Sequence, residues 1–206
     1  MRCKPLLISC LLGLVALPSQ AELPFLQPNQ PYSGVRIIET SEGDFQQTVY
    51  WTPDKVRTET ELPGMSMTNI VREDLGVMWI SNPMMGGCLE QSIEGADELA
   101  QMGGNIINPD NVDYEELGSE EIDGYQTTKY QVTDTEDSTT HEAVFWVTED
   151  NILVRMEIEP DDSVSEGSFT MRLTSLEIGP QDDALFESPG SCQKMPAMPG
   201  MPPQGQ

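Results

Sequence analysis

Short stretches in which apolar and polar residues alternate are the feature that most limits how this 206-residue chain can fold. The clearest stretch covers residues 151–159, where Ile152, Val154, Met156 and Ile158 fall on one side. A period of two places successive side chains on opposite faces of a β-strand. The pattern therefore predicts a sheet with one buried face.

Similar patterns, each ended by turn residues, predict eight more strands. We expect them at residues 32–40, 45–51, 55–61, 65–73, 76–81, 125–133, 141–148 and 168–178. Tight hairpin turns are expected at residues 74–76 and 149–151. In the last strand the apolar positions are odd up to Leu173 and even from Leu176, which predicts a β-bulge near Thr174-Ser175.

One interval has helical spacing instead. Within residues 92–102, apolar residues recur three or four positions apart, and Gly103-Gly104 follows as a stop signal. A further helical turn is expected around residues 110–117. This order predicts a mainly β fold with a small helical insert, built as a large curved antiparallel sheet or half-open β-barrel covered by short helices.

The first 21 residues predict export. Arg2 and Lys4 precede an apolar run over residues 6–17, and Ser19-Gln20-Ala21 places small residues where a leader peptidase cleaves. The run is shorter than the roughly 20 residues that span a bilayer, and no second apolar stretch follows. We expect a signal peptide over residues 1–21 that is cleaved after Ala21, a periplasmic protein, and no stable membrane span.

A second interpretation of the leader concerns Cys10. The segment Leu7-Ile8-Ser9-Cys10 has the spelling of a lipoprotein processing site, and processing there would anchor the chain. Few apolar residues precede Cys10, and the apolar run continues past it, whereas a leader core needs roughly 7–15 such residues. The sequence therefore favours release over anchoring at Cys10.

The body and the tail of the chain differ in composition. Residues 22–193 are expected to form a single domain, and residues 194–206, rich in Met, Pro and Gly, a disordered tail. Met195, Met198 and Met201 recur every three residues, and thioethers suit Cu(I). A flexible tail explains the same spacing, so we predict no metal site and no cofactor.

Charge excludes one class of partner. The chain has 10 basic and 35 acidic residues and a net charge of −25. Arg2 and Lys4 leave with the leader, so eight basic residues remain against 35 acidic ones, a net charge of −27. Nucleic acids and anionic lipid headgroups bind through Lys and Arg, so neither is expected as a general partner.

Two cysteines, Cys88 and Cys192, remain after the leader, 104 positions apart. In an oxidising compartment such a pair most simply forms one disulfide. In the chain-entropy model a loop of that size stabilises the fold by about 4–5 kcal/mol. The alternative is two buried free thiols.

Catalytic motifs are missing from the sequence. His141 is the single histidine, and GxSxG, HExxH, phosphate-binding glycine loops and EF-hand spacings are absent. Chance pairs are common among 35 acidic residues, so paired carboxylates do not identify a site. We predict a protein that is not an enzyme and has no catalytic residues.

The strand at residues 141–148 is apolar on both sides. Ala143, Phe145 and Val147 alternate with Val144 and Trp146. Such a strand is covered on two sides, or lines a cavity as well as a core. Core packing is the more common reason for buried aromatic residues.

Several segments, taken in order, resemble a known family. They are residues 51–59 with their Lys-x-Arg strand, 70–74, 77–80, 124–130, 145–147, 153–155 and the closing segment 185–189. This order is similar to uncharacterised exported bacterial domains related to the outer-membrane lipoprotein-sorting carriers. The resemblance spans most of residues 32–194 and implies a half-closed antiparallel barrel wrapped over helices, with an apolar cavity for acyl chains.

The resemblance also implies a function. It suggests a non-catalytic periplasmic protein that carries or senses a lipophilic ligand such as an acyl chain or a lipoprotein. The two-sided apolar strand at residues 141–148 favours the same function, and Trp79, Phe145 and Trp146 are the candidate ligand-binding residues. The alternative is an envelope protein–protein interaction or scaffold module without a small ligand. An enzyme would instead need a polar cleft with convergent acids. The oligomeric state is left open by the sequence.

Overall fold

Twelve strands form a single sheet in the computed structural model, which describes residues 23, 25, 27–93, 112–136, 139–158 and 168–194. The strands are β1 (Tyr32–Thr40), β2 (Gly43–Thr52), β3 (Lys55–Leu62), β4 (Met65–Arg72), β5 (Val77–Asn82), β6 (Gly87–Ser92), β7 (Val112–Ile122), β8 (Tyr125–Glu136), β9 (Thr139–Thr148), β10 (Leu153–Ile158), β11 (Phe169–Ile178) and β12 (Cys192–Lys194). All nine strands predicted from the sequence are present, within a few residues of their expected ends.

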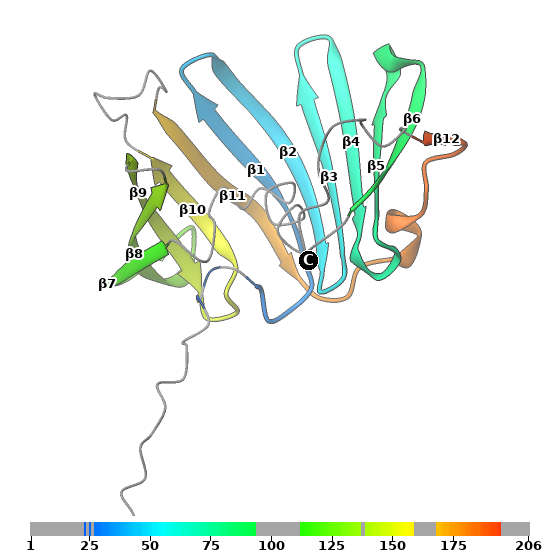
Figure 1. Cartoon of the computed structure of the whole chain (residues 1–206). Helices are drawn as coiled ribbons and strands as arrows, with labels where there is room; N and C mark the ends of the chain where they lie inside the picture. Colours follow the sequence, from blue (N-terminus) through cyan, green and yellow to red (C-terminus); the bar gives the residue numbers. More distant parts are fainter. Residues whose placement is uncertain are drawn as a thin grey trace, which may run out of the picture.

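The strand order is β12-β6-β5-β4-β3-β2-β1-β11-β10-β9-β8-β7. Consecutive antiparallel hairpins build β1 to β6 on one side and β7 to β11 on the other (Figure 1). The two halves meet where β1 pairs antiparallel with β11, and the short β12 adds to β6 in parallel. The sheet does not close, so it is an open, curved sheet, as predicted.

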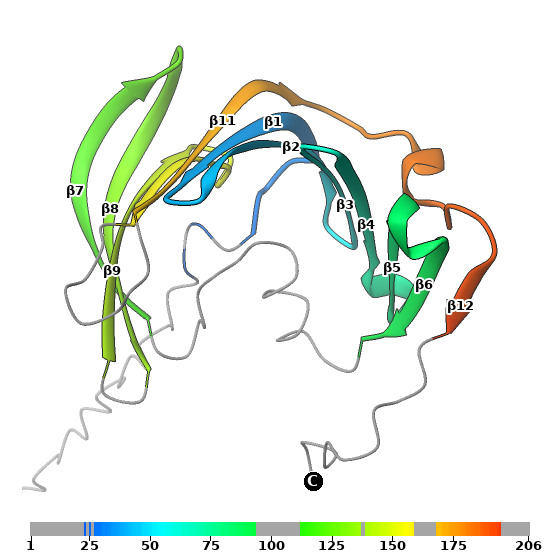
Figure 2. The same ribbon diagram turned by 90° about the horizontal axis from the view of Figure 1, so that it is seen from above.

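The sheet is strongly curved and has two distinct faces. Figure 2 shows an arch, with the segment before β1 running inside it and the segment after β11 running outside it. Strand registers assign residues to the two faces: Ile38, Val49 and Leu173 share the concave face, and Ile37, Ile70 and Trp79 the convex face. This division is used throughout.

The predicted bulge in β11 is confirmed. Val35 pairs with Thr174 but Ser33 pairs with Glu177, so one extra residue is inserted in β11. Ser175 takes a positive φ of 54° at this point. The insertion allows both Leu173 and Leu176 to be buried, although their numbers differ in parity.

The two expected hairpin turns are also present. A 3₁₀ turn, η1 (Glu73–Leu75), joins β4 to β5 and ends at Gly76, which has a φ of 63°. Asn151, with a φ of 59°, lies between β9 and β10. Asn and Gly tolerate this left-handed conformation better than other residues, which explains why they mark these turns.

One prediction was wrong. The helical turn expected around residues 110–117 is not formed in the described part, because residues 112–117 belong to β7, which pairs with β8 along its length. The Glu-rich sequence of β7 favours a helix locally, but the backbone hydrogen bonds to β8 outweigh that small preference. β7 is an edge strand with mostly exposed side chains, so no alternating apolar pattern marks it.

Other predictions lie largely or wholly outside the described residues. The expected helix at 92–102 is one: its first residue, Ser92, ends β6, and Ile93 is irregular. The leader lies outside them, as do residues 195–206 of the predicted tail, whereas Lys194 belongs to β12. The helical elements within the described ranges are 3₁₀ turns: η1, η2 (Pro83–Met85) and η4 (Asp183–Phe186). None of the described helices is long and apolar enough to cross a membrane.

Candidate ligand-binding site

The concave face is apolar over most of its width. From β2 to β8, one row of neighbouring side chains crosses six strands: Phe45, Ile38, Met171, Met156, Phe145 and Tyr130. With strands about 4.8 Å apart, this row is about 24 Å long. Along this row the concave side of the sheet is apolar from β2 to β8.

One half of this face is closed. Phe145, Met156 and Met171 are buried in the main core. Phe25, from the segment before β1, is 4% exposed and packs with its ring centroid 5.1 Å from Phe145 and 5.9 Å from Tyr130. Burial raises the pKa of the Tyr130 hydroxyl. The aromatic cluster thus fills the concave side of β8 and β9.

The other half of the concave face is less covered. Here β2, β3 and β4 carry apolar side chains that are only half-buried, and we call these residues the concave patch: Phe45, Trp51, Val56, Leu62, Met65 and Met67. Trp51 stacks on Tyr32 with ring centroids 6.0 Å apart. Methionine side chains are flexible and adapt to differently shaped apolar partners. The concave patch therefore offers an adaptable apolar surface.

A row of polar side chains crosses the patch, between its Phe45 end and its Trp51 end. Arg36 Nη1 donates to Gln47 Oε1 at 3.1 Å, and Gln47 Nε2 donates to Thr60 Oγ1 at 3.1 Å. Arg36 Nη2 also lies 3.4 Å from the Tyr32 hydroxyl, to which it donates. Arg36, Gln47 and Thr60 are register neighbours on β1, β2 and β3. We call these three residues the polar row.

Of the three residues proposed from the sequence, Phe145 lies on the concave face and Trp146 on the convex one. Trp146 is 4% exposed, and its indole Nε1 donates to Glu120 at 2.8 Å. The Lys129 ammonium lies 4.8 Å from the ring centroid, and the Arg155 guanidinium 4.9 Å. The strand is therefore covered on both sides, and the indole face meets two cations.

Trp79 lies on the convex side of β5, seven strands along the sheet from β9, which carries the other two residues. Its Nε1 donates to Glu90 at 3.0 Å, and this bond, with a smaller contribution from Lys194, lowers the pKa of the Glu90 carboxyl. Trp79 packs in a cluster with Ile70, Cys88 and Phe186. The structure does not bring Trp79, Phe145 and Trp146 into one site, and their role in ligand binding remains a prediction.

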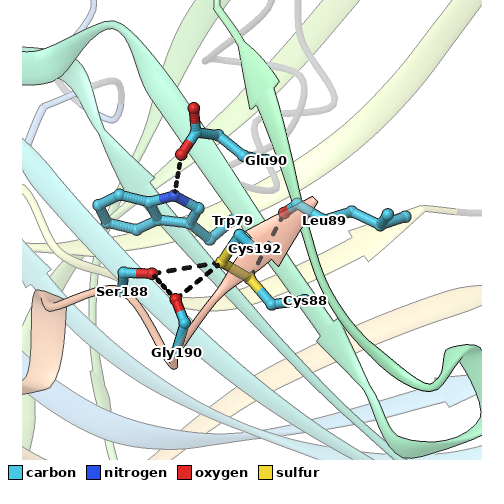
Figure 3. Close-up of a disulfide and its surroundings, with 7 residues drawn as sticks. All are labelled: Trp79, Cys88, Leu89, Glu90, Ser188, Gly190 and Cys192. Carbon is cyan, nitrogen blue, oxygen red and sulfur yellow. Dashed lines mark hydrogen bonds between the residues drawn. A yellow bond between two sulfur atoms is a disulfide. The ribbon is translucent and has the colours of Figure 1, made fainter. Parts of the chain in front are cut away.

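The disulfide predicted from the sequence is present beside Trp79. Cys88 and Cys192 lie opposite each other on β6 and β12, with Cα atoms 4.4 Å apart (Figure 3). The bridge fastens the segment that follows β11, residues 179–194, across the convex face. We call this segment the C-terminal strap.

Three basic residues of β3 and β4 also hold the strap. Lys55 pairs with Asp183 at 2.6 Å, Arg57 Nη1 donates to the Leu185 carbonyl at 3.0 Å, and Arg72 Nη1 to the Phe186 carbonyl at 3.2 Å. The hydrogen bond from Lys55 lowers the pKa of the Asp183 carboxyl. The Lys-x-Arg strand noticed in the sequence is thus the anchor of the strap.

Sequence reasoning missed the concave patch and the polar row. Alternation in residues 45–51 and 55–61 predicted that Phe45, Trp51 and Val56 lie on the apolar side of their strands. It did not predict which side of the sheet would be concave. Within the described ranges, no three His, Cys, Asp or Glu side chains converge to hold a metal ion. His141 is exposed on β9.

Comparison with known proteins relates the chain to one domain family. The family model described as a domain of unknown function (DUF4412) matches residues 35–158. The search of curated proteins gave no match.

Solved structures show the same fold at low sequence identity. The MucB crystal structure superposes with a TM-score of 0.55 and 14% identity over 82% of this chain and 62% of that chain. The Pseudomonas aeruginosa MucA/MucB complex gives 0.55 and 14%, over 88% and 64%. An uncharacterised conserved protein from Thermus thermophilus gives 0.54 and 13%, over 81% and 90%.

The chain thus spans less than two thirds of the MucB chains but nearly all of the Thermus protein. The fold is the lipoprotein-carrier-like fold that the sequence segments resembled.

Proposed function

The chain belongs to the DUF4412 family, and on that premise we propose that it is a non-catalytic binding protein that carries or senses a lipophilic ligand on the concave face of its sheet. The concave patch carries this proposal. Its six apolar residues are half-buried on the inner side of an open, curved sheet, next to a polar row. Apolar surface gathered in one place, with a few polar groups beside it, is typical of small-ligand sites.

A binding role rather than catalysis is supported by the kind of side chains present. The concave positions of β1 to β4 are mainly aliphatic, aromatic, Thr and amide residues, with no Asp or Glu among them in these described strands. Among the other residue types that serve in general acid–base catalysis, His, Lys, Tyr and Cys, these concave positions hold Tyr32, which accepts a hydrogen bond from Arg36. A structural neighbour was solved as a complex of two proteins, MucA and MucB.

We further propose that the protein acts in the periplasm after cleavage behind Ala21. The leader-like first 21 residues and the disulfide support this location, because disulfides persist in oxidising compartments. The intact mass of the protein from a periplasmic extract should match a chain that begins at Glu22. A lipid-modified chain that begins at Cys10 and sediments with membranes would contradict it.

Native mass spectrometry of the protein from its own periplasm is the most direct test of ligand binding. We expect a bound species that organic extraction removes and that has the mass of a lipid or another lipophilic molecule. An empty protein that also fails to bind a fluorescent fatty-acid analogue would overturn the proposal.

Tryptophan fluorescence can locate the ligand. The chain has three tryptophans, and only Trp51 lies in the concave patch, whereas Trp79 and Trp146 lie on the convex face. Titration with a fatty acid should change the emission of the wild type, and Trp51→Phe should abolish the change. If Trp79→Phe or Trp146→Phe abolishes it instead, the ligand binds elsewhere.

A matched pair of variants separates the two faces. Phe45 and Ile37 are both half-buried and lie in adjacent strands, but on the concave and convex faces respectively. We expect Phe45→Gln to weaken ligand binding about tenfold through lost apolar contact. Ile37→Gln should leave affinity unchanged, and equal losses would contradict a concave site.

Protein–protein interaction remains the second candidate function, and one observation favours it. β7 is an eleven-residue edge strand at the end of the sheet, and exposed edges can pair with a strand of a partner. An affinity pull-down that enriches one envelope protein, with no lipid bound, would support this function. Substituting Pro for Glu115, inside β7, should then abolish the enrichment.

A further inference from the structure

Charge is distributed unevenly between the two faces of the central sheet. On the convex side of β10, β11, β1, β2, β3 and β4, charged residues occur on every strand, such as Glu39, Asp44, Arg57, Arg155 and Arg172. On the concave side of the same described strands, Arg36 is the one charged residue. In a chain with 35 acidic residues, its place on an apolar surface requires an explanation.

The contacts of Arg36 leave its charge uncompensated within the described residues. Its two hydrogen-bond partners, Gln47 and Tyr32, are both neutral. Arg36 takes part in none of the ion pairs that the described residues form. Its Nε atom is buried and has no hydrogen-bond partner there.

A guanidinium in this position costs free energy unless an anion joins it. Removal of a cation from water is unfavourable, and neutral hydrogen-bond partners offset only part of the loss. Its planar set of donors suits the two oxygens of a carboxylate. Gln47 and Tyr32 hold the guanidinium in place, so the polar row presents a fixed cation beside the concave patch.

We propose that Arg36 binds the headgroup of an amphiphile with a single carboxylate, such as a long-chain fatty acid, whose alkyl chain lies on the concave patch. This inference rests on the proposed function and names its ligand class. One cation matches one carboxylate charge, whereas a phosphate monoester carries about −1.5 to −2 at neutral pH. Thr60 and Gln47 provide further polar atoms next to the headgroup.

The test compares three probes that share one alkyl chain: hexadecanoate, hexadecanol and hexadecyl phosphate. Affinities are measured by displacement of a fluorescent fatty-acid analogue from the full-length protein after delipidation. The wild type should bind hexadecanoate more tightly than the other two. Arg36→Gln should weaken hexadecanoate binding about 10- to 100-fold, as expected for a charged hydrogen bond, and leave hexadecanol binding unchanged.

A matched control carries the same charge change on the other face. Arg172 is exposed on β11, adjacent to β1, and points to the convex side. Arg172→Gln should leave all three affinities unchanged. If it weakens hexadecanoate binding as much as Arg36→Gln does, long-range charge explains the effect and the proposal is wrong.

The remaining outcomes are distinguishable. If Arg36→Gln weakens hexadecanoate and hexadecanol equally, Arg36 has a structural role only. If hexadecyl phosphate binds more tightly than hexadecanoate and depends on Arg36, the headgroup assignment is wrong. If the wild type binds none of the probes, the proposed function itself fails. If Arg36→Gln does not fold, Arg36→Lys replaces it in the test, because this variant keeps the positive charge. Arg36→Lys should then still bind hexadecanoate more tightly than hexadecanol, and loss of that preference would overturn the proposal.

Discussion

Gly34 shows how tightly β1 and β11 meet at the centre of the sheet. A Cβ added at Gly34 would lie 2.7 Å from Leu173 Cδ1 and 3.3 Å from the Thr174 carbonyl oxygen. Leu173 is 2% exposed and has little room to move away. A glycine is therefore required here by close packing rather than by backbone conformation.

We expect Gly34→Ala to lower the free energy of unfolding by about 1–3 kcal/mol, because the new methyl group overpacks the core. Urea denaturation followed by circular dichroism measures this. Ser33→Ala, one residue away on the convex face, should cost much less. An unchanged or raised stability of Gly34→Ala would show that Leu173 can repack.

For other residues the sequence predicted the face of the strand, but it did not predict which side chains would surround them. The parity of Phe145 and Trp146 placed them correctly on opposite faces of β9. Trp146 is covered by Lys129, Arg155 and Glu120, from β8, β10 and β7. Those contacts depend on strand order and register, which one sequence does not give. For the same reason, the sequence did not predict that Arg36 would lie among neutral side chains on the concave face.

At the scale of elements, alternation identified the strands that have one buried face. It could not identify β7, whose side chains are mostly exposed, or β12, which has three residues. β6 was missed because its short sequence, which begins at Gly87, shows little alternation. The strap was visible only as a closing segment, since its hold on β3 and β4 comes from side chains distant in the chain.

The strap should loosen in acid. Hydrogen bonding to Lys55 lowers the pKa of Asp183 from an ordinary 3.8, and bonding to Arg72 does the same for Asp74. A carboxylate whose folded pKa lies below its unfolded value stabilises the fold above the unfolded value. That contribution is lost as the pH falls through the lower, folded value. The ion pairs are exposed, so the effect is small and sensitive to salt.

Comparison with Asp183→Asn measures this effect. At about pH 7 the wild type should melt at a slightly higher temperature than the variant. The difference should shrink as the pH falls below 3.8 and disappear once the pH is below the lowered, folded pKa of Asp183. Hydrogen exchange at residues 183–186 should report the same loss. Glu39→Gln, on the convex face of β1, serves as the control, and a difference that grew in acid would contradict the sign of the linkage.

For the whole molecule, the Cys88–Cys192 bridge joins positions 104 residues apart. Replacing both cysteines by serine should lower the free energy of unfolding by about 2–5 kcal/mol, since the unfolded chain regains freedom. Chemical denaturation of the variant and of the oxidised wild type measures the difference. Non-reducing peptide mapping should find the two cysteines linked in the wild type, and two free thiols in the intact protein would refute the bridge.

The sequence predicted the overall architecture more completely than the order of the strands within the sheet. Nine predicted strands in hairpin order, interrupted by a predicted helical insert, were enough to indicate a large curved antiparallel sheet or half-open barrel. The position of β1 in the middle of the sheet, beside β11, was not evident, because neighbours in a sheet need not be neighbours in sequence. The concave patch depends on that arrangement and so could not be assembled from strand patterns alone.

The pairing of β6 with β12 also sets an order of assembly. Cys88 is made long before Cys192, and all the other strands are made before β12. During synthesis Cys88 cannot pair with Cys192 until β12, which carries Cys192, has been made. The bridge between them therefore marks a chain whose sheet is complete, and any earlier partner of Cys88 has to be exchanged before the protein can mature.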